Sequence, residues 1–249
     1  AKTIVMGINE ETYEQTRHNI VSAASCTTTC MAHMMKPLLD YFGPKKMLNV
    51  FMATAHAATS SQEVLDRLPK AGAKDLRKNR SIMNNIILTS TGAATTLALV
   101  LPEMKDIGLM AESVRVPLST GSLVILVIAF HDEQKDHISR DLLNKIYADA
   151  ARMEKRGYVK YTEEQNVSSD IIGYYRPAVI IEGNETHTRT AFVNLDVNRV
   201  CSLVKPDLPP DLNIAITQAV VYGWYDNELG SFSNMLGDLT VRVASLLYE

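Results

Sequence analysis

Cys26 and His56 are the residues of this chain best suited to nucleophilic chemistry. Cys26 lies where a predicted strand passes into a predicted helix, within the run Ser-Cys-Thr-Thr-Thr-Cys. A thiol at a helix start faces unpaired backbone N–H groups and the positive end of the helix dipole, which favour the thiolate. His56 ends another predicted strand, and an imidazole is the usual group that takes a thiol proton. The two residues therefore predict covalent catalysis through cysteine if the fold brings them together.

Two other interpretations of these residues stay open on the sequence. A free cysteine is more often a buried, unreactive side chain, and His56 is one of six histidines. Cys26, Cys30 and His33 also have C-x3-C-x2-H spacing, which includes residue types that bind zinc. Zinc sites usually take a tetrahedral set of ligands from separate turns, and no second pair of comparable spacing follows. We therefore predict no metal site.

The composition is that of an ordinary globular protein. The 249 residues carry a formal net charge of −3, and 46% of them are hydrophobic and 21% charged. This balance argues against a nucleic-acid coat and a polybasic membrane anchor. The longest apolar run, residues 123–130, is far shorter than the roughly 20 residues of a membrane span, and we expect no signal peptide. Three cysteines imply no disulfide framework, so we expect a reduced, cytoplasmic protein.

Hydrophobic patterning predicts the elements that position the two side chains. Apolar residues recur at helical spacing from residue 30 to residue 42, so a helix follows Cys26, bent or ended early by Pro37 and stopped by Gly43. A buried strand over residues 48–55 precedes His56. Other expected strands cover residues 2–7, 19–24, 110–116, 122–130, 178–181, 190–195 and 215–224, expected helices cover 93–101, 139–153 and 234–248, and expected loops cover 59–81 and 205–211. Many strands with few helices between them predict an α+β fold, a mostly antiparallel sheet with helices on one face.

Several segments resemble motifs of the phosphorylating glyceraldehyde-3-phosphate dehydrogenases, in the same order along the chain. The run at residues 25–30 is similar to the nucleophile motif, and His-Ala-Ala-Thr at residues 56–59 is similar to the histidine motif. Residues 85–94 resemble the phosphate-loop segment, and Arg-Val-Pro at residues 115–117 resembles the arginine motif. Residues 164–170 and 224–228 match as well, so the resemblance covers nearly the whole chain. Semialdehyde-type dehydrogenases share the cysteine but differ in the residues around it.

The resemblance implies a role for each residue of these motifs. Cys26 would attack the aldehyde to form a thiohemiacetal, and His56 would take the hydroxyl proton as hydride leaves to NAD. Inorganic phosphate would then attack the thioester and release an acyl phosphate. The implied binding residues are Thr59 and Arg115 for the substrate's phosphate, Ser25, Thr27, Thr91 and Gly92 for inorganic phosphate, and Asn227 for the nicotinamide carboxamide. Hydroxyl and N–H groups at two helix starts suit a phosphate dianion.

The dinucleotide-binding fingerprint of that family does not occur in this sequence. The 12 glycines are scattered, and no Gly-x-Gly-x-x-Gly follows a predicted strand. The resemblance therefore implies a C-terminal catalytic half. Residues 1–25 would be the end of a dinucleotide-binding domain, 26–232 the catalytic domain, and 233–249 a helix that packs on the cofactor domain. We expect the chain alone to bind NAD weakly and to lack dehydrogenase activity.

Departures from the family pattern lie close to the predicted site. Ala23 and Thr29 stand where the family usually has asparagine on either side of the nucleophile. After Asn227, the segment Gly-Ser-Phe-Ser at residues 230–233 carries one residue more than the family's Gly-Tyr-Ser. The basic run at residues 70–80 resembles the loop that lines a neighbouring subunit's cofactor site in the family's tetramer. The resemblance thus implies a homo-oligomer.

Two classes of function stay open. The first is the catalytic domain of an NAD-dependent, phosphorylating glyceraldehyde-3-phosphate dehydrogenase, an oxidoreductase of glycolysis, with erythrose-4-phosphate dehydrogenase as a close variant. The second is a non-catalytic assembly or interaction module derived from the same family, which the changes at Ala23 and Thr29 favour. The intact set of nucleophile, base and anion-binding residues favours the first class. Neither nucleic acid nor a membrane is expected as a partner.

Overall fold

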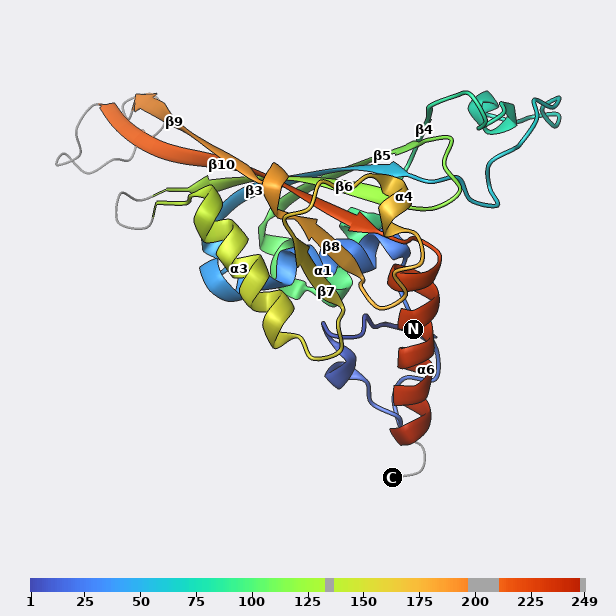
Figure 1. Cartoon of the computed structure of the whole chain (residues 1–249), viewed down its shortest axis with the longest axis horizontal. Helices are drawn as coiled ribbons and strands as arrows, with labels where there is room; N and C mark the ends of the chain where they lie inside the picture. The colour runs from blue at the N-terminus through green and yellow to red at the C-terminus, as the bar shows by residue number, and fades with distance from the viewer. Residues whose placement is uncertain (133–136, 197–210, 247–249) are drawn as a thin grey trace.

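The computed structural model describes residues 1–132, 137–196 and 211–246 of the 249-residue chain. Within this part, one sheet of eight strands runs through the molecule, and a separate pair of short strands lies near the N-terminus (Figure 1). The large sheet has the spatial order β4 (Ile87–Thr89), β5 (Gly108–Arg115), β3 (Met47–His56), β6 (Ser122–His131), β10 (Asp211–Tyr225), β8 (Val179–Glu182) and β7 (Val159–Thr162), with β9 (His187–Asp196) paired to β10. The short pair is β1 (Lys2–Thr3) and β2 (Val21–Ser22).

The α+β class is confirmed, but the prediction of a mostly antiparallel sheet was wrong because the sheet is mixed. β3 pairs in parallel with β5, and β7 pairs in parallel with β8. The pairings of β6 with β3 and of β10 with β6, β8 and β9 are antiparallel. A parallel pair needs a long crossover. The connection between β3 and β5 provides one, since it contains β4 and the helix α2.

The long helices lie on the same side of the sheet, as the sequence predicts (Figure 1). Serine caps the starts of two of them, α1 and α3, which satisfies N–H groups of the first turn. The helical segments are η1 (Glu10–Thr12), α1 (Cys26–Phe42), η2 (Pro44–Lys46), η3 (Leu76–Asn79), α2 (Ala93–Val100), η4 (Pro102–Asp106), α3 (Arg140–Met153), α4 (Ser168–Ile171), η5 (Gly183–Glu185), the π-helix η6 (Leu229–Asn234) and α6 (Met235–Leu246).

The core lies between α1 and the sheet. On β6 the side chains of Val124, Leu126 and Ile128 are fully buried, whereas the alternating residues between them are only partly buried. This period of two places one face of the strand against the helices and leaves the other face partly open. From α1, Met34 and Leu38 are buried completely against the same core. Burial of this face fixes the helix that starts at Cys26 relative to the strand that ends at His56.

Pro37 lies inside α1 and does not end it. The helix continues to Phe42 and closes at Gly43, whose φ of 71° suits glycine. Proline lacks an N–H, so the helical bond to the carbonyl of His33 cannot form. The residues on both sides of Pro37 pack into the core, and this packing carries the helix through the missing bond.

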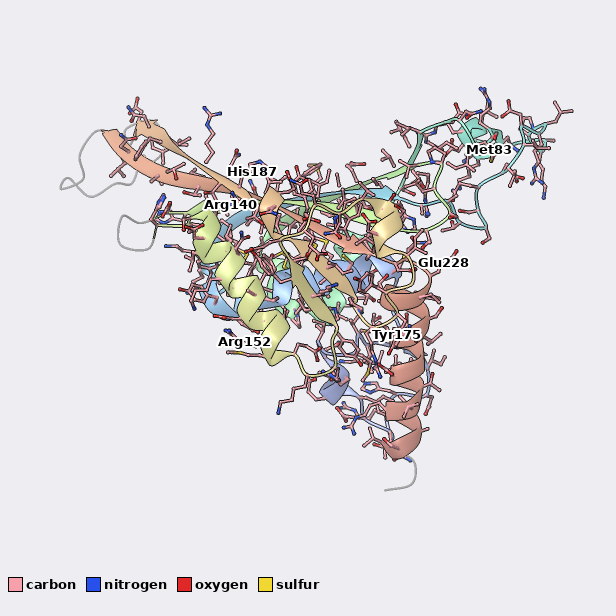
Figure 2. All side chains as sticks on the ribbon, viewed as in Figure 1. Met83, Arg140, Arg152, Tyr175, His187 and Glu228 are labelled. Carbon is pink, nitrogen blue, oxygen red and sulfur yellow. The ribbon has the colours of Figure 1, made fainter. Side chains whose placement is uncertain are left out.

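Two segments project from opposite ends of the sheet. The connection between β3 and β4, residues 57–86, extends from one end and carries Met83, while β9 and the paired part of β10 extend from the other (Figures 1 and 2). Figure 2 also shows Arg140 and Arg152 at the two ends of α3, below the sheet. The projecting connection exposes several large apolar side chains, including Leu65 and Leu68.

Most predicted elements occur, with shifted ends. The expected strands at residues 2–7 and 19–24 shrink to β1 and β2, and the sequence missed β4, β7, α4 and the π-helix. The expected closing helix is observed as α6. The expected proline-rich loop lies outside the described residues except for its last residue. No helix in the described ranges is long and apolar enough to cross a membrane.

Candidate active site

Cys26 and His56 meet at one end of the sheet. Cys26 is the first residue of α1, His56 is the last residue of β3, and Cys26 Sγ lies 3.3 Å from His56 Nε2. His56 is only 4% exposed, while Cys26 is partly accessible. The structure therefore brings the predicted nucleophile and base together across 30 residues of chain.

Arg115 reaches the same histidine from the neighbouring strand. It ends β5, and the parallel pairing of β5 with β3 sets Arg115 opposite His56. Arg115 Nη1 lies 2.7 Å from His56 Nδ1 and donates to the backbone oxygen of Ala57 at 2.9 Å. The same oxygen lies 2.8 Å from His56 Nδ1. Parallel strands end at a common edge, which is why two distant motifs converge here.

Burial is the largest influence on the pKa of the Cys26 thiol. It raises this pKa, and it outweighs the opposing effects: hydrogen bonds from the hydroxyl and backbone N–H of Thr27, the charge of Arg115, and the N–H of Cys26 itself. The helix start thus acts in the predicted direction, while burial, whose depth the sequence does not show, acts against it.

His56 is neutral near physiological pH. Burial, followed by the positive charge of Arg115, lowers its pKa to about 4, against the opposing effect of the Ala57 carbonyl. A neutral imidazole has one nitrogen free to accept a proton. The site thus combines a protonated thiol with a neutral base at contact distance.

Tyr225 is a site residue that sequence reasoning missed. Its hydroxyl lies 3.1 Å from Thr27 Oγ1 and 2.9 Å from Thr54 Oγ1, and its ring meets that of His56 edge-on with centroids 5.9 Å apart. Tyr225 is 1% exposed, and burial raises its pKa, so the phenol stays protonated. One side chain therefore ties the start of α1 to β3. A tyrosine at the end of a buried strand, inside a recognised motif, was the available signal.

Thr27 lies between Tyr225 and the thiol. It is buried, and its hydroxyl is hydrogen-bonded to the phenol. Its hydroxyl and backbone N–H also lower the pKa of Cys26, so this residue faces the thiol as well. Its expected role as a ligand of inorganic phosphate stays a prediction.

Asn227 is joined through Ser122 to Ala57, the residue that follows His56. Ser122 Oγ accepts the backbone N–H of Ala57 at 3.0 Å and donates to Asn227 Oδ1 at 2.8 Å. Asp226 fixes the turn that carries Asn227, since its Oδ1 accepts the N–H groups of the next residues, Glu228 and Leu229. Ser122 begins β6, and the sequence alone did not indicate its role. Asn227 is thus held at the same edge of the sheet as His56.

The extra residue after Asn227 forms part of a π-helical turn. Ser231 N donates to Asp226 O and Ser233 N donates to Glu228 O, and each bond spans five residues. This turn, η6, lies at the start of the helix that Glu228 precedes (Figure 2), in the segment where one residue more than in the family is predicted from the sequence, and Asn227 is bonded to Ser122.

The remaining predicted anion-binding residues lie at helix starts or in turns. Ser25 caps α1, and Thr91 and Gly92 precede α2, where Thr91 Oγ1 accepts the N–H of Ala93. Thr59 bonds within its own turn, to Gln62 and a neighbouring serine. Among the described residues, no hydrogen bond joins Thr59, Thr91 or Gly92 to Cys26 or Arg115.

Other features lie apart from this site. Cys30 is buried with its sulfur 4.0 Å from Met34 Sδ, and His33 Nδ1 donates to the Thr29 carbonyl. Over residues 1–132, 137–196 and 211–246, no group of three or more potential ligand side chains is arranged to hold a metal ion. A cavity of about 810 Å³ between α1 and α3 includes none of the predicted site residues in its lining.

Comparison with known proteins shows the family to which the chain belongs. The family model described as the C-terminal domain of glyceraldehyde 3-phosphate dehydrogenase matches residues 25–200. The chain is 41% identical over 245 residues to "Glyceraldehyde-3-phosphate dehydrogenase 2" of Streptomyces avermitilis, covering 98% of this chain and 62% of that protein. It is 37% identical over 242 residues to "Glyceraldehyde-3-phosphate dehydrogenase 1" of Bacillus subtilis, covering 97% and 61%. The chain thus spans about 62% of the length of the first of these relatives.

Proposed function

Because the chain belongs to the family of the glyceraldehyde-3-phosphate dehydrogenase C-terminal domain, we propose that it supplies the catalytic cysteine of an NAD-dependent, phosphorylating aldehyde dehydrogenase. The observation that carries this proposal is the 3.3 Å contact between Cys26 Sγ and His56 Nε2. The substrate is a short aldehyde that bears a phosphate group, of the glyceraldehyde-3-phosphate type.

The first step joins Cys26 to the aldehyde. His56 takes the thiol proton at Nε2, Sγ forms a bond to the carbonyl carbon, and the proton passes to the carbonyl oxygen to give a thiohemiacetal. His56 and the backbone N–H of Cys26 at the helix start stabilise the oxyanion as it forms. The raised pKa of Cys26 does not prevent this step once Nε2 carries no proton, because this nitrogen then accepts at 3.3 Å from Sγ.

The second step oxidises the carbon. His56 removes the hydroxyl proton of the thiohemiacetal, the carbon–oxygen double bond re-forms, and the C–H bond breaks with its electron pair. Bound NAD supplies the acceptor for that hydride. Tyr225 holds the start of α1 against β3 and so keeps Sγ and the imidazole in register.

The third step releases the product. An oxygen of inorganic phosphate bonds to the thioester carbon, the C–S bond breaks, and Cys26 leaves as thiolate and regains a proton. The N-terminal ends of α1 and α2, with Ser25, Thr91 and Gly92, offer N–H and hydroxyl groups suited to that dianion. Arg115 and Thr59 are the residues proposed for the substrate's own phosphate group.

Asn227 fits one end of the cofactor. Its Oδ1 is occupied by Ser122, which leaves the amide N–H groups to donate to a carboxamide oxygen, and it is 6% exposed beside the catalytic edge. The adenine and pyrophosphate ends require a further domain. Exposed Leu236 and Val241 on α6 support the proposal that this helix packs against that domain.

A second copy of the chain is the proposed partner. The face of the sheet opposite the helices exposes Phe51 and Met110, and Leu68 on the projecting segment is 91% exposed. Exposed apolar side chains of this kind are typical of protein interfaces. The same surfaces would serve a non-catalytic assembly module, but such a module would not require the contacts of His56 with Cys26 and Arg115.

The proposed activity can be tested in a chimaera. The chain is fused behind the remaining N-terminal part of the Streptomyces avermitilis relative, and NADH formation is measured with glyceraldehyde-3-phosphate and phosphate. We expect phosphate-dependent turnover that Cys26→Ser abolishes and that a Ser substitution of the buried Cys30 does not. A chimaera that binds NAD but forms no NADH contradicts the proposal, and erythrose-4-phosphate as a second substrate decides between the two variants.

A further inference from the structure

His56 Nδ1 has two neighbours with incompatible demands. The Ala57 carbonyl, 2.8 Å away, can only accept a hydrogen bond, whereas Arg115 Nη1, 2.7 Å away, can only donate one. If Nδ1 carries the proton, it bonds to the carbonyl, but then two donors face each other at 2.7 Å. If Nδ1 is bare, it accepts from Arg115, the proton resides on Nε2, and the bare nitrogen faces the carbonyl oxygen at 2.8 Å. The positive charge of the guanidinium favours this second arrangement, because it repels a proton on Nδ1.

The two tautomers give opposite chemistry at Cys26. With the proton on Nε2, the imidazole donates toward Sγ at 3.3 Å and cannot take the thiol proton. With the proton on Nδ1, Nε2 is the acceptor that a general base requires. Cys26, Arg115 and the Tyr225 ring are the titratable groups that face His56, and only Arg115 contacts Nδ1.

The guanidinium is itself incompletely paired. Arg115 Nε is buried with no hydrogen-bond partner, while Nη1 serves both His56 and the Ala57 carbonyl. An anion beside Arg115 would satisfy this donor, and a guanidinium binds phosphate or sulfate through two parallel hydrogen bonds. The group is therefore poised to move toward a bound anion.

We propose that Arg115 is a positioning residue that selects the tautomer of His56, and that an anion which draws the guanidinium from Nδ1 converts Nε2 from donor to acceptor. In this exchange His56 stays neutral. The proton on Nε2 passes to solvent, and Nδ1 takes a proton from solvent and donates a hydrogen bond to the Ala57 carbonyl. The inference rests on the proposed function only in taking the substrate's phosphate group as that anion. Binding of the substrate would then switch on the base.

The test reads the two ring nitrogens directly. The chain labelled with ¹⁵N-histidine is examined by NMR at neutral pH, where the nitrogen shifts separate protonated from bare nitrogens, and His56→Gln assigns the signals. We expect protonated Nε2 in the unmodified chain without added anion. We expect protonated Nδ1 in Arg115→Gln and in the unmodified chain saturated with sulfate. The pKa of His56 should rise by roughly one unit in Arg115→Gln, since a neighbouring positive charge is lost.

Arg152→Gln is the matched control, because Arg152 pairs with Asp149 on α3 and does not contact His56. It should leave the His56 signals unchanged. A proton on Nδ1 in the unmodified chain without anion overturns the inference, as does a pattern that neither Arg115→Gln nor sulfate alters. If Arg115→Gln does not fold, the sulfate titration of the unmodified chain decides. Neither aldehyde nor NAD is needed, so a chimaera without dehydrogenase activity would refute the proposed function and leave this result standing.

Discussion

The two faces of the sheet differ in what they require from outside the chain. On the helical face, Met34 and Val124 are fully buried, and the Cys26–His56 pair is fixed by contacts made within the described residues. On the opposite face, Phe51 and Met110 remain exposed. The difference teaches that the proposed nucleophile and base are positioned by contacts within this chain, whereas the proposed cofactor and oligomer would depend on surfaces that other domains or copies must cover.

The largest effect is expected at the pair itself. In His56→Asn, alkylation of Cys26 by iodoacetamide at neutral pH in saturating sulfate should slow by about 10²–10⁴-fold, because the thiol loses its proton acceptor. Peptide mass mapping follows the label, and Cys30 serves as an internal control. A matched substitution of the exposed His187 should leave the rate unchanged. Equal rates in the chain and in His56→Asn would show that the helical face does not organise a reactive thiol.

Core substitutions should distinguish the two faces by stability. Met34→Ala leaves a cavity under the sheet and should lower the free energy of unfolding by about 2–5 kcal/mol. Phe51→Ala, on the open face, should lower it by less than about 1 kcal/mol in the monomeric chain. Urea unfolding measures both. Similar losses for the two variants would mean that the open face already packs against something in the isolated chain.

The pH dependence of stability should reveal the buried imidazole. The pKa of His56 is lowered to about 4 in the folded chain, so the unfolded chain binds the proton first as the pH falls. The stabilisation is present above the ordinary histidine pKa near 6.5 and is lost as the pH falls toward 4. Between pH 7 and pH 5 the loss should be roughly 2 kcal/mol. His56→Gln should remove this part of the urea-unfolding profile, and an unchanged profile would contradict the burial.

Tyr225→Phe should have a smaller effect, on both the stability of the chain and the reactivity of Cys26. Loss of the hydroxyl removes the bonds to Thr27 and Thr54 and should cost about 1–2 kcal/mol of stability. Alkylation of Cys26 should slow severalfold, because the start of α1 is no longer tied to β3. The two measurements are unfolding in urea and the rate of alkylation. Loss of stability with no change in rate would limit Tyr225 to a structural role.

The smallest effect on the isolated chain is expected at the exposed segments. Leu68→Ser should change the free energy of unfolding by no more than about 0.5 kcal/mol, since the side chain is 91% exposed. It should weaken self-association, which sedimentation equilibrium measures. Unchanged association would remove the projecting segment from the proposed contact between copies.

The sequence predicted those parts of the fold that rest on long, regular patterns. The helical spacing before Phe42 and the apolar run of β6 identified α1 and β6 within a few residues. β7, with the sequence Val-Lys-Tyr-Thr, lacks the apolar run that identified the equally short β8. The parallel pairing of β3 with β5 was missed because pairing depends on how a long connection returns to the sheet.

The site shows the same difference between features that local sequence patterns predict and features that depend on the folded chain. Cys26, His56, Arg115 and Asn227 were predicted from their motifs, because residue type and local order carry that signal. The contact of Thr27 with Tyr225 joins residues 198 positions apart, and no local pattern reports it. The protonation of Cys26 likewise depends on burial, which only the folded chain defines.

The most direct test of the central claim is acyl transfer through Cys26 without any cofactor. The chain is treated with p-nitrophenyl acetate, the acetylated residue is identified by mass, and inorganic phosphate is then added. The account predicts one acetyl group on Cys26, no label on Cys30, and phosphate-dependent release of acetyl phosphate. Acetylation of residues other than Cys26, or an acetyl-Cys26 thioester that phosphate does not cleave, would contradict the claim that this chain carries a preorganised nucleophile and an anion site beside it.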